Sequence, residues 1–402
     1  MRDMPSFHDQ AWTAMGTVRR AAAAIAWSWL CLAMSPELRA QERLIAIPPA
    51  NATWNVGFTQ VTSVRELSDG SVIVSDAGEN RLYRVDWQSG GAAVVGGIGE
   101  GPGEYRSAGW SYALAGDTTL FTDPIGRRWH LVAGHRIVRT IPSSHPPIQL
   151  LGAWLDGADR NGRVLGTVPI GDMLTGMREE ADSLWLLLIE DAFNGEPRID
   201  TIGTLKGRAQ CGLFTGARGG TAGPPCERRA YQTEDVALLF NDGWVAVATW
   251  NPYRVTWRAP DGRWIRGAAL DVRRISVDDR EKCLMDRGLD PGNPRECDRA
   301  RIARTTWPDA LPPILYSRAL GRMIGAGSAT LQAAPDGNVV IRRTPSATVP
   351  GTRYDIIDRS GSYAGRIVLP ANEAIVGFGA ASVYTIRTDD VDLQWLGRHD
   401  WR

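Results

Sequence analysis

The feature that most constrains this chain is a short turn signal that recurs along it. In its clearest copy, Asp69-Gly70 is followed by the apolar run SVIVSD, and residues 77–80 turn the chain again before RLYRVDW. Glycine readily adopts the positive φ that tight hairpin turns require, and alternating apolar residues are typical of half-buried strands. Residues 64–91 therefore predict an antiparallel meander, which cannot bury both of its faces unless copies of it stack.

The same turn occurs four more times, and an apolar run follows each copy. The further turns are Gly116-Asp117, Asn161-Gly162, Asp242-Gly243 and Asp336-Gly337. Successive turns are separated by 47, 45, 81 and 94 residues, so the two long steps each contain one repeat and an insertion of roughly 35 or 48 residues. A degenerate sixth copy follows in residues 375–398. Six units of about 45 residues, each mostly strand, predict an all-β fold, a six-bladed β-propeller. A two-sheet sandwich is the alternative, but it does not explain a constant step.

The boundaries of the propeller follow from the same pattern. Residues 43–49, RLIAIPP, form a lone apolar strand, which we expect to pair with the sixth unit and close the ring. Residues 41–402 are then one domain, with insertions near 206–230 and 271–325. The second insertion has helical character in two segments, DDREKCLMD and RECDRARIAR, and predicts a small helical insertion between blades four and five.

Residues 1–40 have the order of a secretory signal peptide. Arg19-Arg20 precede a 14-residue apolar stretch, and small residues follow before Gln41. We expect translation to begin at Met15 and cleavage to follow Ala40. The stretch is too short to span a membrane, so the mature chain is expected to be periplasmic or secreted, with no membrane span.

The two insertions each contain two cysteines. An even number of cysteines in an exported chain suggests disulfides, although four cysteines allow three pairings. We expect Cys211 to pair with Cys226 and Cys283 with Cys297, because these pairs need only local loop closure. Zinc is the alternative, but the chain has no C-x-x-C motif after residue 40.

The charge balance excludes one class of partner. The chain has 45 basic and 45 acidic residues, and removal of residues 1–40 leaves 41 and 42. No electrostatic attraction to nucleic acid or to an anionic membrane follows from these numbers. The remaining partner classes are a small molecule, a glycan or a protein, and we expect a monomer.

Three segments carry a resemblance to a known family. They are an L-x-D-G-x-V-x-V-x-D meander at Leu67–Asp76, the GEGPGEY loop at Gly99–Tyr105, and the LPP segment at Leu311–Pro313. Together they resemble the secreted six-bladed β-propellers of GC-rich bacteria, which are related to the NHL-repeat propellers. The resemblance covers most of residues 44–402. It implies the fold and brings no assigned activity.

Carboxylates and arginines are the candidate site residues, because histidine is scarce and no nucleophile motif is complete. Asp76 and Asp123 lie at matching strand ends, each five residues before an arginine, and residues at matching places in a ring can line one face. We expect a polar funnel there. Its candidate residues are Asp76, Asp123, Glu104, Trp250, Arg342 and Arg387. The alternative is that these side chains bond backbone groups between blades, or bond one another.

Two classes of function fit this sequence. The first is a non-enzymatic extracytoplasmic binding or scaffold propeller of unknown ligand. The alternative is a metal-dependent hydrolase or lyase with calcium in the propeller tunnel, held by Asp, Asn and carbonyl oxygens. We predict no cofactor and no catalytic residue, and the metal remains unknown. The sequence leaves open whether the chain is an enzyme.

Overall fold

The computed structural model describes residues 43–152, 155–169, 183–194, 196–207, 230–231, 233–289, 293, 295–315 and 329–401. Residues 1–40, with the predicted signal peptide and the start at Met15, lie outside the described part. Everything below concerns the compact unit Leu44–Arg402. No helix among the described residues is long and apolar enough to cross a membrane.

The predicted meander of the first repeat is present. Its strands are β2 (Val61–Glu66), β3 (Val72–Asp76), β4 (Arg81–Asp86) and β5 (Gly91–Val94), and they pair in chain order as one antiparallel sheet. Gly70 has a φ of 80° in the turn between β2 and β3. The turn glycines of the later copies also have positive φ, at Gly116, Gly162, Gly243 and Gly337. The turn signal therefore does mark the same hairpin in each copy.

The other strands repeat this arrangement. A second sheet contains β8 (Ser111–Ala113), β9 (Thr118–Asp123), β10 (Arg128–Ala133) and β11 (Arg136–Ile141). Another contains β20 (Leu331–Ala333), β21 (Val339–Arg342), β22 (Thr352–Ile357) and β23 (Tyr363–Leu369). The last contains β24 (Glu373–Phe378), β25 (Ser382–Thr388) and β26 (Gln394–Asp400), with β1 (Ala52–Thr53) on its outer edge.

An eight-stranded sheet supplies the middle of the chain. Its first half is β12 (Gly157–Ala158), β13 (Val164–Pro169), β14 (Ser183–Glu190) and β15 (Arg198–Lys206). Its second half is β16 (Val236–Leu239), β17 (Val245–Trp250), β18 (Tyr253–Arg258) and β19 (Trp264–Arg266). The two four-stranded halves meet where Gly157 of β12 pairs in parallel with Leu239 of β16. A short pair, β6 (Gly97–Ile98) with β7 (Glu104–Tyr105), and the helix α2 (Pro146–Leu151) lie in connections.

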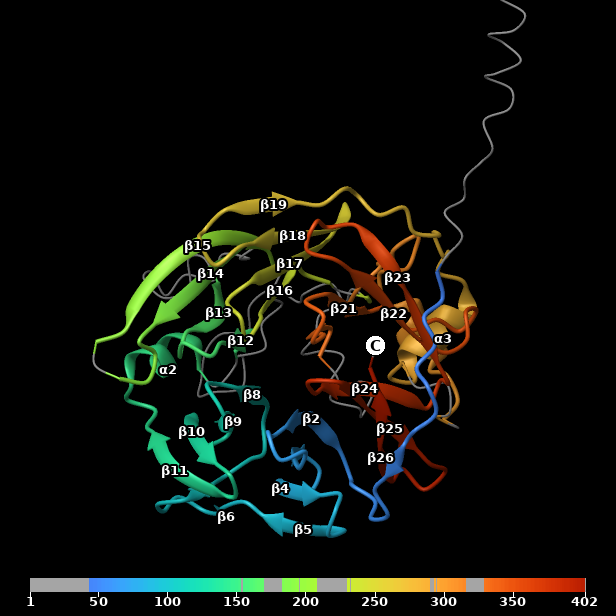
Figure 1. The fold of residues 1–402 in the computed structure, drawn as a ribbon. Helices are drawn as coiled ribbons and strands as arrows, with labels where there is room; N and C mark the ends of the chain where they lie inside the picture. Colours follow the sequence, from blue (N-terminus) through green and yellow to red (C-terminus); the bar gives the residue numbers. More distant parts are fainter. Residues whose placement is uncertain are drawn as a thin grey trace, which may run out of the picture. The chain divides into compact units, whose positions relative to one another are not determined.

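Hydrophobic clusters between successive sheets close these sheets into a β-propeller (Figure 1). Adjacent residues of one strand point to opposite faces, so a central strand serves two clusters. Val72 and Val74 of β3 pack with Tyr384 of the last sheet, whereas Ile73 between them packs with Phe121 of the second sheet. Comparable clusters join every other successive pair of four-stranded units among the described residues. The cluster between the last sheet and the first makes the arrangement a ring.

The strand that closes the ring is not the one that the sequence predicted. Ala52 and Thr53 of β1 pair with Arg398 and Gly397 of β26, and the Trp54 amide donates to the Leu396 carbonyl at 2.8 Å. Residues 43–49 instead begin beside β23, where Leu44 forms a parallel bridge with Arg366. Pro48 and Pro49 have no N–H to donate to a ladder, which explains why the pairing to β26 starts after them.

The helical insertion after β19 is also present. Helix α3 (Asp279–Asp286) begins at Asp278, whose carboxylate accepts the amides of Arg280 and Glu281 at 3.0 Å. Helix α4 (Arg299–Ala303) is linked to α3 by the predicted disulfide Cys283–Cys297, with a Cα–Cα distance of 5.4 Å. The other predicted pair, Cys211–Cys226, lies outside the described residues.

Candidate functional site

The first predicted site residue, Asp76, is engaged by its own blade. Its side chain is fully buried at the end of β3. One carboxylate oxygen accepts the Thr59 amide, and the other accepts the amides of Gln60 and Gly78, at 2.8 to 2.9 Å. Thr59 and Gln60 belong to the connection that leads into β2. The carboxylate therefore joins the start of the blade to the end of its second strand.

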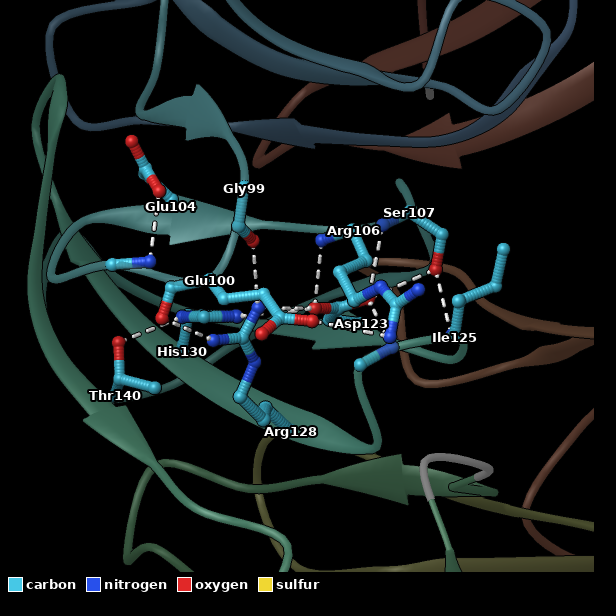
Figure 2. Close-up of polar contacts among 12 residues, drawn as sticks. Gly99, Glu100, Glu104, Arg106, Ser107, Asp123, Ile125, Arg128, His130 and Thr140 are labelled. Carbon is cyan, nitrogen blue, oxygen red and sulfur yellow. Dashed lines mark hydrogen bonds and ion pairs between the residues drawn. The ribbon is translucent and has the colours of Figure 1, made fainter.

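Asp123 does the same in the second blade (Figure 2). Its buried carboxylate accepts the amides of Arg106 and Ser107 at 2.9 Å and that of Gly126 at 2.8 Å. Arg128 lies 3.1 Å from the same carboxylate, and His130 lies 3.9 Å from it. Burial acts to raise the pKa of Asp123, but the nearby His130 side chain, the amides of Arg106 and Gly126 and the Ser107 hydroxyl outweigh it and hold that pKa well below its ordinary value.

The ligand funnel expected at Asp76 and Asp123 stays a prediction, and these contacts give both carboxylates a structural role. Both carboxylates have no exposed surface, and both accept backbone amides of the connections between blades. Both carboxylates fit the alternative interpretation, in which these side chains bond backbone groups between blades. Their matching places in the sequence reflect a repeated hydrogen-bond device at the start of two blades.

The other four predicted residues do not converge on one cavity either. The carboxylate of Glu104 accepts the Gly101 amide at 2.7 Å inside its own loop, as Figure 2 shows. Lys206 lies over the ring of Trp250, 5.0 Å from its centroid. Arg342 is buried at the end of β21, whereas Arg387 is exposed on β25. The four side chains therefore have separate environments.

The structure contains a pocket that the sequence did not single out. It has a volume of about 210 Å³ and lies where the helical insertion meets the blade formed by β20–β23. Residues 272–275 and 311–313 of the insertion form one side. Arg343, Thr344 and Arg353, from β22 and the connection before it, form the other. None of the six predicted funnel residues lines this pocket.

The LPP segment forms a wall of the pocket and is held from the blade. The Nε of Arg343 donates to the Pro313 carbonyl at 2.8 Å, and the Thr344 hydroxyl donates to the Pro312 carbonyl at 2.6 Å. The Thr344 amide also donates to the Pro313 carbonyl, at 3.1 Å. Proline supplies only an acceptor, so these three donors satisfy the carbonyls of the wall.

A second anchor holds the insertion against the blade. Glu281 of α3 is fully buried, and its carboxylate accepts the Ser346 hydroxyl at 2.6 Å and the Ala347 amide at 2.9 Å. The hydroxyl and the amide of Thr348 donate to the same carboxylate at 2.9 and 3.2 Å. A buried carboxylate needs such donors to compensate for lost hydration. Glu281 therefore fixes the loop between β21 and β22, which carries Arg343 and Thr344 into the pocket.

The pocket has an excess of positive charge. Buried Asp355 accepts Arg343 at 2.7 Å, Arg366 at 3.0 Å and the Tyr253 hydroxyl at 3.1 Å. Arg353 is also mostly buried, yet it makes no ion pair in the described part of the chain, and its Nη2 donates to the neutral Thr344 carbonyl at 2.9 Å. Two further arginines, Arg273 and Arg274, are exposed at the rim, and Arg274 lies 3.8 Å from the carboxylate of Asp309.

The pKa of Arg353 agrees with this inventory. Burial, followed by repulsion from Arg343 and Arg366, lowers its pKa to about 10. The guanidinium is still charged near neutral pH, so a positive charge without an acidic partner lies at the pocket wall. Guanidinium groups bind carboxylates and phosphates with two parallel hydrogen bonds. No group of three or more His, Cys, Asp or Glu side chains among the described residues is placed to hold a metal ion.

Sequence reasoning had two partial signals for this pocket. One is the LPP segment, which carries part of the family resemblance, and the other is Arg343, which follows the candidate site residue Arg342. A sharper signal is Arg353 and Asp355 within the strand TRYDII, every residue of which is buried. Charged residues in a fully buried strand require partners, and the partners come from distant parts of the chain.

Comparisons with known proteins give fold-level similarity alone. No protein-family model and no curated protein matches the chain. Among solved structures, it is similar to virginiamycin B lyase from Staphylococcus aureus, with 8% identity, a TM-score of 0.42, and coverage of 86% of this chain and 98% of that one. It is also similar to regucalcin, a calcium-binding protein from Agrobacterium tumefaciens str. C58, with 10% identity, a TM-score of 0.35, and coverage of 90% and 97%.

Because these TM-scores are below 0.5, they carry no argument about this chain, and the fold assignment depends on its own strand order and inter-sheet clusters. The class that the fold and the site define is a β-propeller with a cationic pocket beside a disulfide-linked helical insertion.

Proposed function

We propose that this chain is an extracytoplasmic β-propeller that binds a small molecule without converting it. Its binding site is the pocket between the helical insertion and the β21–β22 connection. The observation that carries the proposal is the construction of that pocket: two distant parts of the chain line a volume of about 210 Å³, and buried Arg353 is one of the lining residues. Concave pockets with a few placed polar groups are the usual form of a small-molecule site.

The chemistry of the walls favours binding over bond cleavage. The pocket presents guanidinium groups, apolar side chains and proline, and the Thr344 hydroxyl is already bonded to the Pro312 carbonyl. General acid–base or nucleophilic catalysis requires a titrating or activated group beside the reacting atoms. The described lining offers guanidinium groups that can bind a charged ligand and apolar side chains that can pack against it.

The binding proposal is tested by native mass spectrometry of the exported chain. Ile275 lines the pocket, and Ile275→Trp should fill it. The same change at Val138, which is exposed on β11, serves as the matched control. We expect a bound small molecule with the wild type and with Val138→Trp, and its loss with Ile275→Trp. Equal recovery from all three proteins would contradict this site.

The extracytoplasmic part of the proposal has its own test. Export with cleavage after Ala40 predicts that the chain recovered from outside the cytoplasm begins at Gln41. N-terminal sequencing checks this directly. A chain that begins before Gln41, or that stays in the cytoplasmic fraction, would overturn the proposed processing while leaving the pocket unaffected.

A further inference from the structure

We infer that the pocket binds an anion through a carboxylate or phosphate group, and that Arg353 is the residue that recognises it. This inference depends on the proposed binding function, because it names the chemical class of the ligand. It follows from an inventory of which charges around the pocket are already paired.

The first step concerns Asp355. Arg353 lies two residues before Asp355 on β22, so the two side chains leave the same face of that strand. Arg343 bonds one oxygen of Asp355, and Arg366 bonds the other. Tyr253 adds a third donor to the oxygen that Arg343 uses. The carboxylate is therefore saturated by groups other than Arg353.

The second step concerns Glu281, the other carboxylate close enough to influence Arg353. Its oxygens accept donors from residues 346–348, and these contacts hold the insertion on the blade. Moving Glu281 toward Arg353 would leave these buried donors unpaired. Glu281 is therefore fully used in holding the insertion on the blade. It attracts Arg353 only through space, without a direct ion pair.

The third step is the energetic consequence for Arg353. A buried charge without an ionic partner destabilises the protein, and the positive charges of Arg343 and Arg366 add to that cost. The single hydrogen bond to the Thr344 carbonyl compensates only in part. An anion in the pocket would supply the missing negative charge. Its binding is favoured because it removes an existing penalty.

The shape of the site limits the anion. A volume of about 210 Å³ is small compared with the 300–1,000 Å³ typical of pockets for drug-sized ligands, so the site suits a small acid or the anionic end of a larger molecule. Arg273 at the rim provides positive charge on the approach, whereas Arg274 lies 3.8 Å from the Asp309 carboxylate. The carbonyls of Pro312 and Pro313 are occupied by Thr344 and Arg343, so they do not repel an anion strongly.

The test is calorimetric titration of the exported chain with inorganic phosphate, succinate and glucose at constant ionic strength. We expect binding of phosphate or succinate, and the stronger of the two identifies the source of the anionic group. Arg353→Met should weaken that binding about tenfold or more, because a charged hydrogen bond contributes about 1.5–3 kcal/mol and 1.4 kcal/mol is a factor of ten. Arg353→Lys should recover part of it, since lysine keeps the charge but lacks the planar fork.

Arg299→Met is the matched control, because Arg299 is exposed on α4 and the substitution removes the same charge. It should leave anion binding unchanged. The melting temperature without ligand provides a second readout. Arg353→Met should be as stable as the wild type or more stable, because the buried charge is removed, whereas a purely structural Arg353 would make the variant less stable.

The outcomes separate this inference from the proposed function. Failure of phosphate and succinate to bind at millimolar concentration would overturn the anion inference, and so would equal binding by Arg353→Met. If glucose binds, and Ile275→Trp abolishes that binding, the pocket is a binding site for a neutral ligand. Loss of binding by Arg299→Met to the same extent as by Arg353→Met would show that net charge, and not this residue, is responsible.

Discussion

The Nη1 of Arg343 lies 2.7 Å from the Oδ2 of Asp355, and both side chains are buried. The contact connects the loop after β21 to the middle of β22. Because Asp355 also bonds Arg366 on β23, one carboxylate joins three consecutive parts of the blade. This contact also places Arg343 where it can hold the proline wall of the pocket.

Asp355→Ala should therefore be strongly destabilising. Removal of one partner of a buried ion pair typically costs about 3–5 kcal/mol, because the remaining charges stay buried without compensation. Urea denaturation measures the change in the free energy of unfolding. Asp271→Ala is the control, since Asp271 is exposed in the insertion, and it should change stability by no more than about 0.5 kcal/mol. Equal effects of the two substitutions would show that Asp355 is not a structural centre.

Ring closure predicts a large effect for Trp54. This side chain is buried in the cluster between the last and the first sheets, directly after the closing strand β1. Trp54→Ala should lower the free energy of unfolding by about 3–5 kcal/mol. Ile45 is only partly buried beside β23, so Ile45→Ala should cost less. If Ile45→Ala lowered the free energy of unfolding more than Trp54→Ala does, residues 43–49 would be the segment that closes the ring.

Asp123 predicts a pH-dependent contribution to stability. Its pKa in the folded protein is below the unfolded value of about 3.9, so its stabilisation is complete above about pH 5 and is lost as the pH falls below that. Asp123→Asn should cost about 3 kcal/mol at neutral pH, and the difference from wild type should shrink in acid. Urea denaturation from pH 7 to pH 3 checks this, with Asp390→Asn at an exposed position as control. A difference that does not vary with pH would contradict it.

The disulfide should stabilise the insertion locally. Cys283 and Cys297 close a short loop with a sequence separation of 14, and closing about 15 residues contributes about 3 kcal/mol by the chain-entropy estimate. In the variant with both cysteines replaced by alanine, hydrogen exchange should accelerate in α3 and α4. Exchange in β2–β5, on the first blade, should stay unchanged. A uniform increase across all blades, or a Cys211–Cys283 link in non-reducing peptide maps, would refute local pairing.

Much of the fold could be predicted from local sequence, because its determinants lie within a few residues of one another. Gly70 and Gly162 adopt positive φ because their hairpins require it, and the alternation in SVIVSD places Val72 and Ile73 on opposite faces. The capping by Asp278 and the pairing of Cys283 with Cys297 are equally local. For these features, the sequence alone was sufficient to predict the strands, the repeat and the helical insertion.

The closing strand, the orientation of Asp76 and the pocket were decided only by tertiary structure. Ala52 pairs with Arg398 on the outer edge of β26. Which segment pairs there depends on its available N–H groups and on the packing of Trp54 into the cluster between the last and first sheets. Matching positions predicted that Asp76 and Asp123 have matching roles, and the sequence left open whether both face a ligand or bond backbone groups, which the assembled blades decided. The pocket forms because Arg353 and residues 311–313 line the same cavity. Its positive charge arises because Asp355 is paired with Arg343 and Arg366 and not with Arg353. Burial and charge pairing belong to the assembled blade and its insertion, and so no local pattern contains them.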